Sequence, residues 1–92
     1  METLSVTVVG QDIFKIVKEK FKLVGINTVN QLNTGNLGNL KTLTYQFDLP
    51  ENEVIGIRKN LLNAMAKDEM RLMPMYLHGD WMRIFVFKPF KL

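Results

Sequence analysis

Ten residues near the middle of the chain alternate between apolar and polar side chains so regularly that only one local structure suits them. In LKTLTYQFDL, residues 40–49, the side chains of Leu43, Tyr45 and Phe47 fall on one side, and threonine and glutamine fall on the other. Side chains alternate between two faces with a period of two in a β-strand. Leu40–Leu49 is therefore predicted to be a strand with one buried and one polar face, in a sheet that needs a covering layer.

Two other segments have helical spacing and can form that layer. Apolar residues recur every three or four positions from Gln11 to Val24 and again from Pro50 to Lys67, which predicts two helices with one buried stripe each. Asp48 is expected to cap the second helix. Gly56 inside that helix indicates close packing, because glycine costs a helix about 1 kcal/mol relative to alanine.

Three further segments are predicted to be strands or parts of a hairpin. Thr3–Val9 alternates between valine or leucine and hydroxyl residues, as a half-buried strand does. Arg71–Leu77 and Trp81–Phe87 flank the residues His78-Gly79-Asp80, which are typical of a tight turn. Pro74 within the first of these two strands indicates an edge position or a bulge, since proline cannot donate to a ladder of hydrogen bonds.

Asparagine recurs at a strict interval of three between the first helix and the alternating strand. The five positions are Asn27, Asn30, Asn33, Asn36 and Asn39. We expect a short strand near Ile26–Leu32 and then a polar turn, in which the glycines permit positive φ. Asn33, Asn36 and Asn39 would be exposed in that turn and are candidates for contact with a partner.

The resulting order, β-α-β-β-α-β-β, resembles the ferredoxin-like split β-α-β layout with one additional strand. The resemblance implies an α+β sandwich in which an antiparallel sheet carries both helices on one face. A single domain spanning residues 1–92 is expected, because two halves of so short a chain would each be close to the minimum for a self-sufficient core. This layout hosts unrelated functions, so function has to be inferred from particular side chains.

Composition limits the chemistry that the chain can perform. Cysteine is absent, which excludes disulfides and thiolate chemistry and favours a cytoplasmic location. No apolar run approaches the roughly 20 residues that span a bilayer, and the first residues do not resemble a signal peptide. With one histidine, His78, and scattered carboxylates, we expect no catalytic residue, metal, cofactor or small-molecule substrate. An enzyme built from Tyr76, His78 and Asp80 is the third-ranked hypothesis.

The last predicted strand, WMRIFVF, carries the most informative side chains. One face holds Trp81, Arg83, Phe85 and Phe87, and the other holds Met82, Ile84 and Val86. If Ile84 and Val86 face the helices, then Trp81, Arg83 and Phe85 project from the uncovered side of the sheet, where they are candidate partner-binding residues together with the three asparagines. If the strand has the opposite orientation, Phe85 and Phe87 face the helices and are core residues.

Two classes of function rank above the enzyme hypothesis. The leading hypothesis is a small non-catalytic binding or regulatory protein, such as an inhibitor, an adaptor or a dimerising module. It would contact another protein or itself, as a homodimer, through the sheet face and the Asn-rich segment. The alternative is an RNA or single-stranded DNA binding protein, because a net charge of +3 modestly favours polyanions and exposed rings stack on bases. Its candidate residues are Lys15, Lys18, Lys22, Lys41, Arg83 and Trp81.

Overall fold

The computed structural model of the chain describes residues 1–75 and 80–89. In chain order the elements are β1 (Glu2–Val9), η1 (Gln11–Ile13), α1 (Phe14–Leu23), β2 (Asn30–Leu37), β3 (Leu40–Leu49), η2 (Glu51–Glu53), α2 (Val54–Ala66), β4 (Arg71–Met75) and β5 (Asp80–Phe87). Each α-helix is preceded by one turn of 3-10 helix. The predicted order of strands and helices is confirmed.

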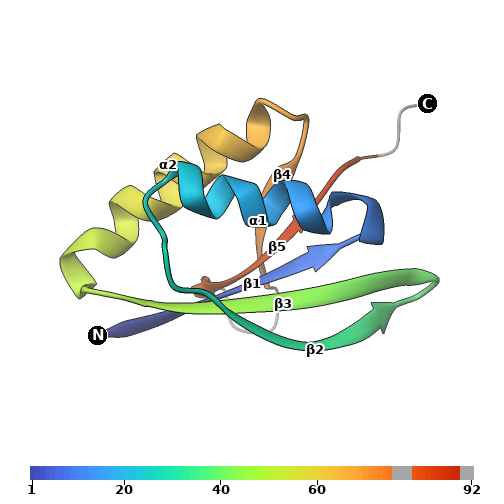
Figure 1. The fold of residues 1–92 in the computed structure, drawn as a ribbon, viewed down its shortest axis with the longest axis horizontal. Helices are drawn as coiled ribbons and strands as arrows, with labels where there is room; N and C mark the ends of the chain where they lie inside the picture. Colours follow the sequence, from blue (N-terminus) through green and yellow to red (C-terminus); the bar gives the residue numbers. More distant parts are fainter. Residues whose placement is uncertain (76–79, 90–92) are drawn as a thin grey trace.

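The five strands form one sheet in the order β2-β3-β1-β5-β4. Strand β1 pairs antiparallel with β3 and parallel with β5, and the outer pairs β2–β3 and β4–β5 are antiparallel. Both helices lie on one face of the sheet (Figure 1), which is the α+β sandwich implied by the ferredoxin-like resemblance. One detail differs: β5 is inserted between β1 and β4, parallel to β1, so the sheet is mixed and not wholly antiparallel.

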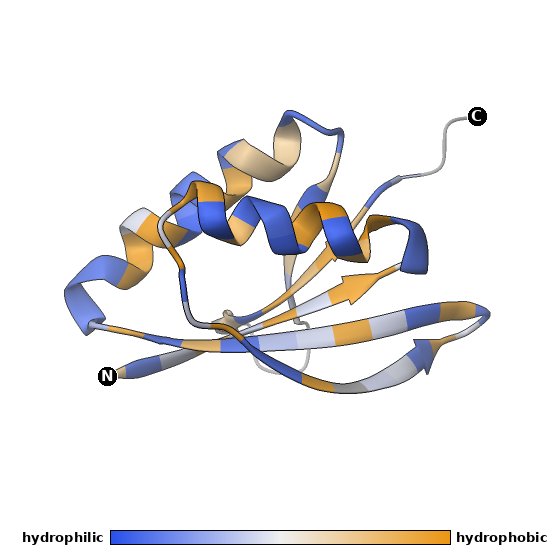
Figure 2. Ribbon diagram, viewed as in Figure 1, coloured by the Kyte–Doolittle hydropathy of each residue, from blue (hydrophilic) through white to orange (hydrophobic). Residues whose placement is uncertain are grey.

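The hydrophobic core lies between the sheet and the two helices. Strand β1 contributes Leu4, Val6 and Val8, all fully buried. The ring of Phe21 in α1 contacts Tyr45 and Phe47 of β3 edge-on, with centroid separations of 5.2 and 5.4 Å, a geometry worth about 0.5–1.5 kcal/mol per pair beyond the buried area. The alternating colours of β1 and β3 in Figure 2 show the period-two pattern behind this one-sided burial.

The orientation of β5 decides which side chains reach the opposite face. Ile84 and Val86 are fully buried against the helices, because β5 lies beside the central strand β1. Arg83 is exposed, and Phe85 and Phe87 are half-buried on the side away from the helices. Of the two orientations that the sequence left open for this strand, the structure has the one in which Ile84 and Val86 face the core.

The Asn-rich segment forms a strand where a turn was expected. The short strand predicted over Ile26–Leu32 is instead β2, Asn30–Leu37, at an edge of the sheet. The turn to β3 consists of two residues, Gly38 and Asn39, with Gly38 at φ +61°. As an edge strand, β2 leaves its described side chains exposed to solvent, so they can remain polar.

Two expectations about α2 were wrong. A Cβ atom added to Gly56 would meet no atom within 4 Å, so this glycine makes no close packing contact. No side chain caps η2 or α2. Asp48 instead accepts a 2.6 Å hydrogen bond from the hydroxyl of Thr3, because β3 continues past it and its side chain lies on the sheet face opposite the helices.

Candidate functional site

The side of the sheet turned away from the helices carries no covering element in the described part of the chain (Figure 1). We call this side the open face. It has a polar half, at the start of β1, and an apolar half, at the end of β1. The two halves offer different chemistry to a ligand.

The polar half is satisfied by hydrogen bonds between neighbouring strands. Three side-chain pairs join β1 to β3: Thr3 with Asp48 at 2.6 Å, Ser5 with Gln46 at 3.1 Å, and Thr7 with Thr44 at 2.9 Å. Each pair is in direct register across the strands. Because these groups already have partners, exchanging them for contacts with a ligand offers little net free energy.

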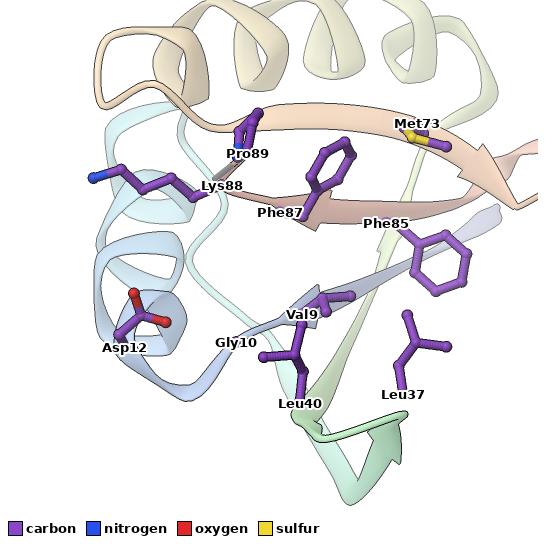
Figure 3. A pocket seen from close by; sticks show the side chains of 10 residues that line it. All are labelled: Val9, Gly10, Asp12, Leu37, Leu40, Met73, Phe85, Phe87, Lys88 and Pro89. Atoms are coloured by element: carbon purple, nitrogen blue, oxygen red, sulfur yellow. The ribbon is translucent and has the colours of Figure 1, made fainter. Parts of the chain in front are cut away.

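The apolar half contains a depression of about 720 Å³, which we call the open-face hollow (Figure 3). Its floor is Val9 at the end of β1. One wall consists of Leu37 and Leu40 from the β2–β3 hairpin, and the other consists of Met73, Phe85 and Phe87 from β4 and β5. Figure 3 shows Leu37, Leu40 and Phe85 converging on the same space.

The two-residue turn explains how the leucine wall forms. Residues that flank such a turn are direct cross-strand neighbours and project from the same face, and Leu37 is paired with Leu40 in this way. Both remain accessible, with 53% and 40% of their surface exposed. Across β1, Met73 is paired with Phe85, so the hollow lies between two apolar cross-strand pairs.

The hollow has one negative and one positive residue at its rim, Asp12 of η1 and Lys88 after β5. Gly10 positions the acid: its amide donates a 2.9 Å hydrogen bond to the carbonyl of Lys41, which ties the start of η1 to β3. A side chain at position 10 would be strained at φ +108° and would place its Cβ 3.0 Å from an Asp12 carboxylate oxygen. Glycine is therefore required here.

Two of the predicted partner-binding residues have described side chains on the open face. Phe85 lines the hollow, and Arg83 is exposed beside a second, more polar depression of about 520 Å³ together with Ser5 and Gln46. For Trp81 in β5, the structure describes only the backbone. Of the proposed surface of rings and a guanidinium, Arg83 and Phe85 thus lie on the open face.

The three predicted asparagines do not join this surface as one cluster. Asn39 lies in the turn and Asn36 in β2 is paired with Lys41. Since Leu37 belongs to the open face, its neighbour Asn36 belongs to the other side. Asn33 lies in β2, and its side chain is outside the described part of the structure. Leu37 and Leu40 of the hairpin line the hollow together with Phe85.

The candidate residues of the nucleic-acid alternative are divided between two sides of the molecule. Lys15, Lys18 and Lys22 are exposed on α1, in the layer that covers the opposite face of the sheet (Figure 1). By its position in β3, Lys41 also belongs to the side of the sheet that carries the helices, whereas Arg83 lies on the open face. One extended strand of nucleic acid cannot contact both groups without passing around an edge of the sheet.

The structure bears on the metal-binding expectation over residues 1–75 and 80–89. No group of three or more histidine, aspartate or glutamate side chains in this part of the chain is placed to hold a metal ion. Of the proposed enzyme residues, Tyr76 and His78 lie outside the described residues, and Asp80 is described by its backbone alone. Neither described helix has the length and apolar character needed to cross a membrane.

Comparisons with protein-family models, curated proteins and solved structures find no match for this chain. The open-face hollow is therefore the principal guide to function. Sequence reasoning missed most of its lining, including Leu37, Leu40 and Met73. The sequence Leu-Gly-Asn-Leu contains the signal that was available, because two apolar residues around a glycine-containing two-residue turn form a cross-strand pair on one face.

Proposed function

We propose that the protein is a non-catalytic binding or regulatory protein that contacts another polypeptide through its open face. The observation that carries the proposal is the open-face hollow, a depression of about 720 Å³ whose walls are apolar and whose leucines are about half exposed. Contiguous apolar surface of this kind marks interaction sites, because its exposure to water is unfavourable. A cytoplasmic location, favoured by the absence of cysteine, belongs to the same proposal.

The free energy available from covering the hollow is substantial for a small protein. Complete burial of a leucine, methionine or phenylalanine side chain stabilises by roughly 1.5–3 kcal/mol. Leu37 and Leu40 retain about half of that potential, and Met73, Phe85 and Phe87 retain a smaller part. A polypeptide that covers all five gains several kcal/mol before the cost of association, which suits an anchor region surrounded by polar contacts.

Selection from a displayed peptide library tests whether the hollow binds polypeptide. We expect the selected peptides to carry apolar anchors and to lose at least about tenfold in affinity when Leu40→Asp places a charge in the leucine wall. Lys18→Glu, on the helix layer, is the matched control and is expected to leave binding unchanged. Selected peptides that bind both variants equally would refute the assignment of the site.

Fluorescence anisotropy with mixed oligonucleotides at low salt separates this proposal from the nucleic-acid alternative. We expect weak binding that does not depend on Leu40. Tight binding that weakens steeply with salt, and that disappears when Lys15, Lys18 and Lys22 are changed to glutamate, would instead identify RNA or single-stranded DNA as the partner and overturn the proposal.

A further inference from the structure

The charges around the open-face hollow favour a partner with the same charges. Among the residues that the structure describes, Asp12 and Lys88 are the charged ones that line it, so the described rim has no net charge although the whole chain carries +3. In a two-fold symmetric interface each patch meets itself, and every charge must find its counter-charge within that same patch. A rim with one acid and one base meets this requirement, whereas a rim that binds polyanions should be basic.

The edges of the sheet are poorly suited to self-association, which leaves the face. At one edge, β2 has an irregular register between Gln31 and Thr34. At the other edge, β4 has five residues, includes Pro74 and has an irregular register after it. Bulges, proline and short length are the features that prevent strands from pairing edge to edge with another copy.

We infer that the occupant of the open-face hollow is a second copy of this chain, so that two sheets pack face to face about a two-fold axis. The hairpin wall of one protomer then lies against the aromatic wall of the other, with the sheets about 10 Å apart as in other sheet sandwiches. The rim charges Asp12 and Lys88 of the two protomers pair across the edge of the interface. This inference rests on the proposed function, because it uses the same surface.

Analytical ultracentrifugation over a wide concentration range tests the inference. We expect the wild-type chain to sediment at twice the chain mass at high concentration, and Leu40→Asp to raise the dimer dissociation constant by more than about tenfold. Ile55→Asp is the matched control, since Ile55 is 72% exposed on the outward side of α2. A wild-type chain that stays monomeric, or a dimer lost in Ile55→Asp but kept in Leu40→Asp, would overturn the face-to-face dimer.

A charge exchange at the rim provides a test that does not disturb the apolar residues. Lys88→Asp is expected to weaken dimerisation several-fold, and adding Asp12→Lys to the same chain is expected to restore it, because the two signs are then exchanged. Dimerisation that is indifferent to Lys88→Asp, or that the second change fails to restore, contradicts the arrangement. Circular dichroism of each variant verifies the fold.

The outcomes for the two proposals are separable. If the chain is monomeric but selected peptides still bind in a Leu40-dependent manner, the homodimer is refuted and the binding function stands. If neither self-association nor peptide binding depends on Leu40, both are refuted.

Discussion

Replacing Gly56 with alanine should stabilise the protein, and the structure allows the size of the effect to be worked out. The residue lies inside α2 and is exposed, and an added Cβ meets no atom within 4 Å. No steric cost therefore offsets the gain in helix propensity, which is about 0.8–1.0 kcal/mol from glycine to alanine. We expect the free energy of unfolding to rise by about 0.5–1 kcal/mol. The lower end of this range allows for a difference in conformational freedom that is smaller here than in model helices.

Urea denaturation followed by circular dichroism measures this change. The midpoint should rise while the slope of the transition stays the same, because the surface exposed on unfolding hardly changes. In a thermal melt the same difference corresponds to an increase of about 2–8 °C, given that 1 kcal/mol shifts the midpoint of a domain of this size by about 4–8 °C.

Gly38→Ala is the matched control, for which the expected change in the free energy of unfolding has the opposite sign. A Cβ at this position also meets no atom within 4 Å, but the residue has φ +61° in the β2–β3 turn. An L-residue with a side chain is disfavoured there by about 1–2 kcal/mol, so this variant should be less stable. If Gly56→Ala is neutral or destabilising while the helix content is intact, the outward side of α2 is not open in solution and the reasoning from exposure is wrong.

Two further predictions concern polar groups within the fold. Burial raises the pKa of Tyr45 above the ordinary tyrosine value of 10.0, so the unfolded chain loses this proton first and stability should fall as the pH rises past about 10. Tyr45→Phe should remove that part of the alkaline loss, as seen in urea midpoints measured from pH 8 to 11. For the 2.9 Å hydrogen bond between Thr7 and Thr44, each single change to valine should cost about 1 kcal/mol, whereas the double change should cost less than the sum. Additive costs in that double-mutant cycle would show that the bond contributes nothing.

Local periodicity was sufficient to predict the buried face of β3, where Leu43, Tyr45 and Phe47 are buried. For β5, alternation separated Ile84 and Val86 from Phe85 and Phe87 but left open which pair faces the helices, and the structure buries Ile84 and Val86. Pro74 indicated an edge position or a bulge, and β4 is an edge strand whose register becomes irregular after that proline. These successes share a cause, since burial on one side of a sheet imposes a period of two on the sequence itself.

The position of β5 and the composition of the hollow could not be obtained in the same way. Alternation describes one strand at a time and contains no information on which strand lies beside it, so the parallel pairing of β5 with β1 was not predicted. The sequence predicts a short strand near Ile26–Leu32 and then a turn, because asparagine and glycine tolerate positive φ. Pairing with β3 overrode that preference, and with it came the placement of Leu37 and Leu40 on the open face.

The insertion of β5 next to the central strand has a consequence for biosynthesis. Strand β4 joins the sheet through β5, so a growing polypeptide that has not yet emerged as far as residue 87 leaves one side of β1 without its neighbour. An unpaired strand edge is a template for association with other chains. Truncation before residue 80 should therefore give an aggregating product and not a smaller folded unit, and co-translational folding should be delayed until the last strand has left the ribosome.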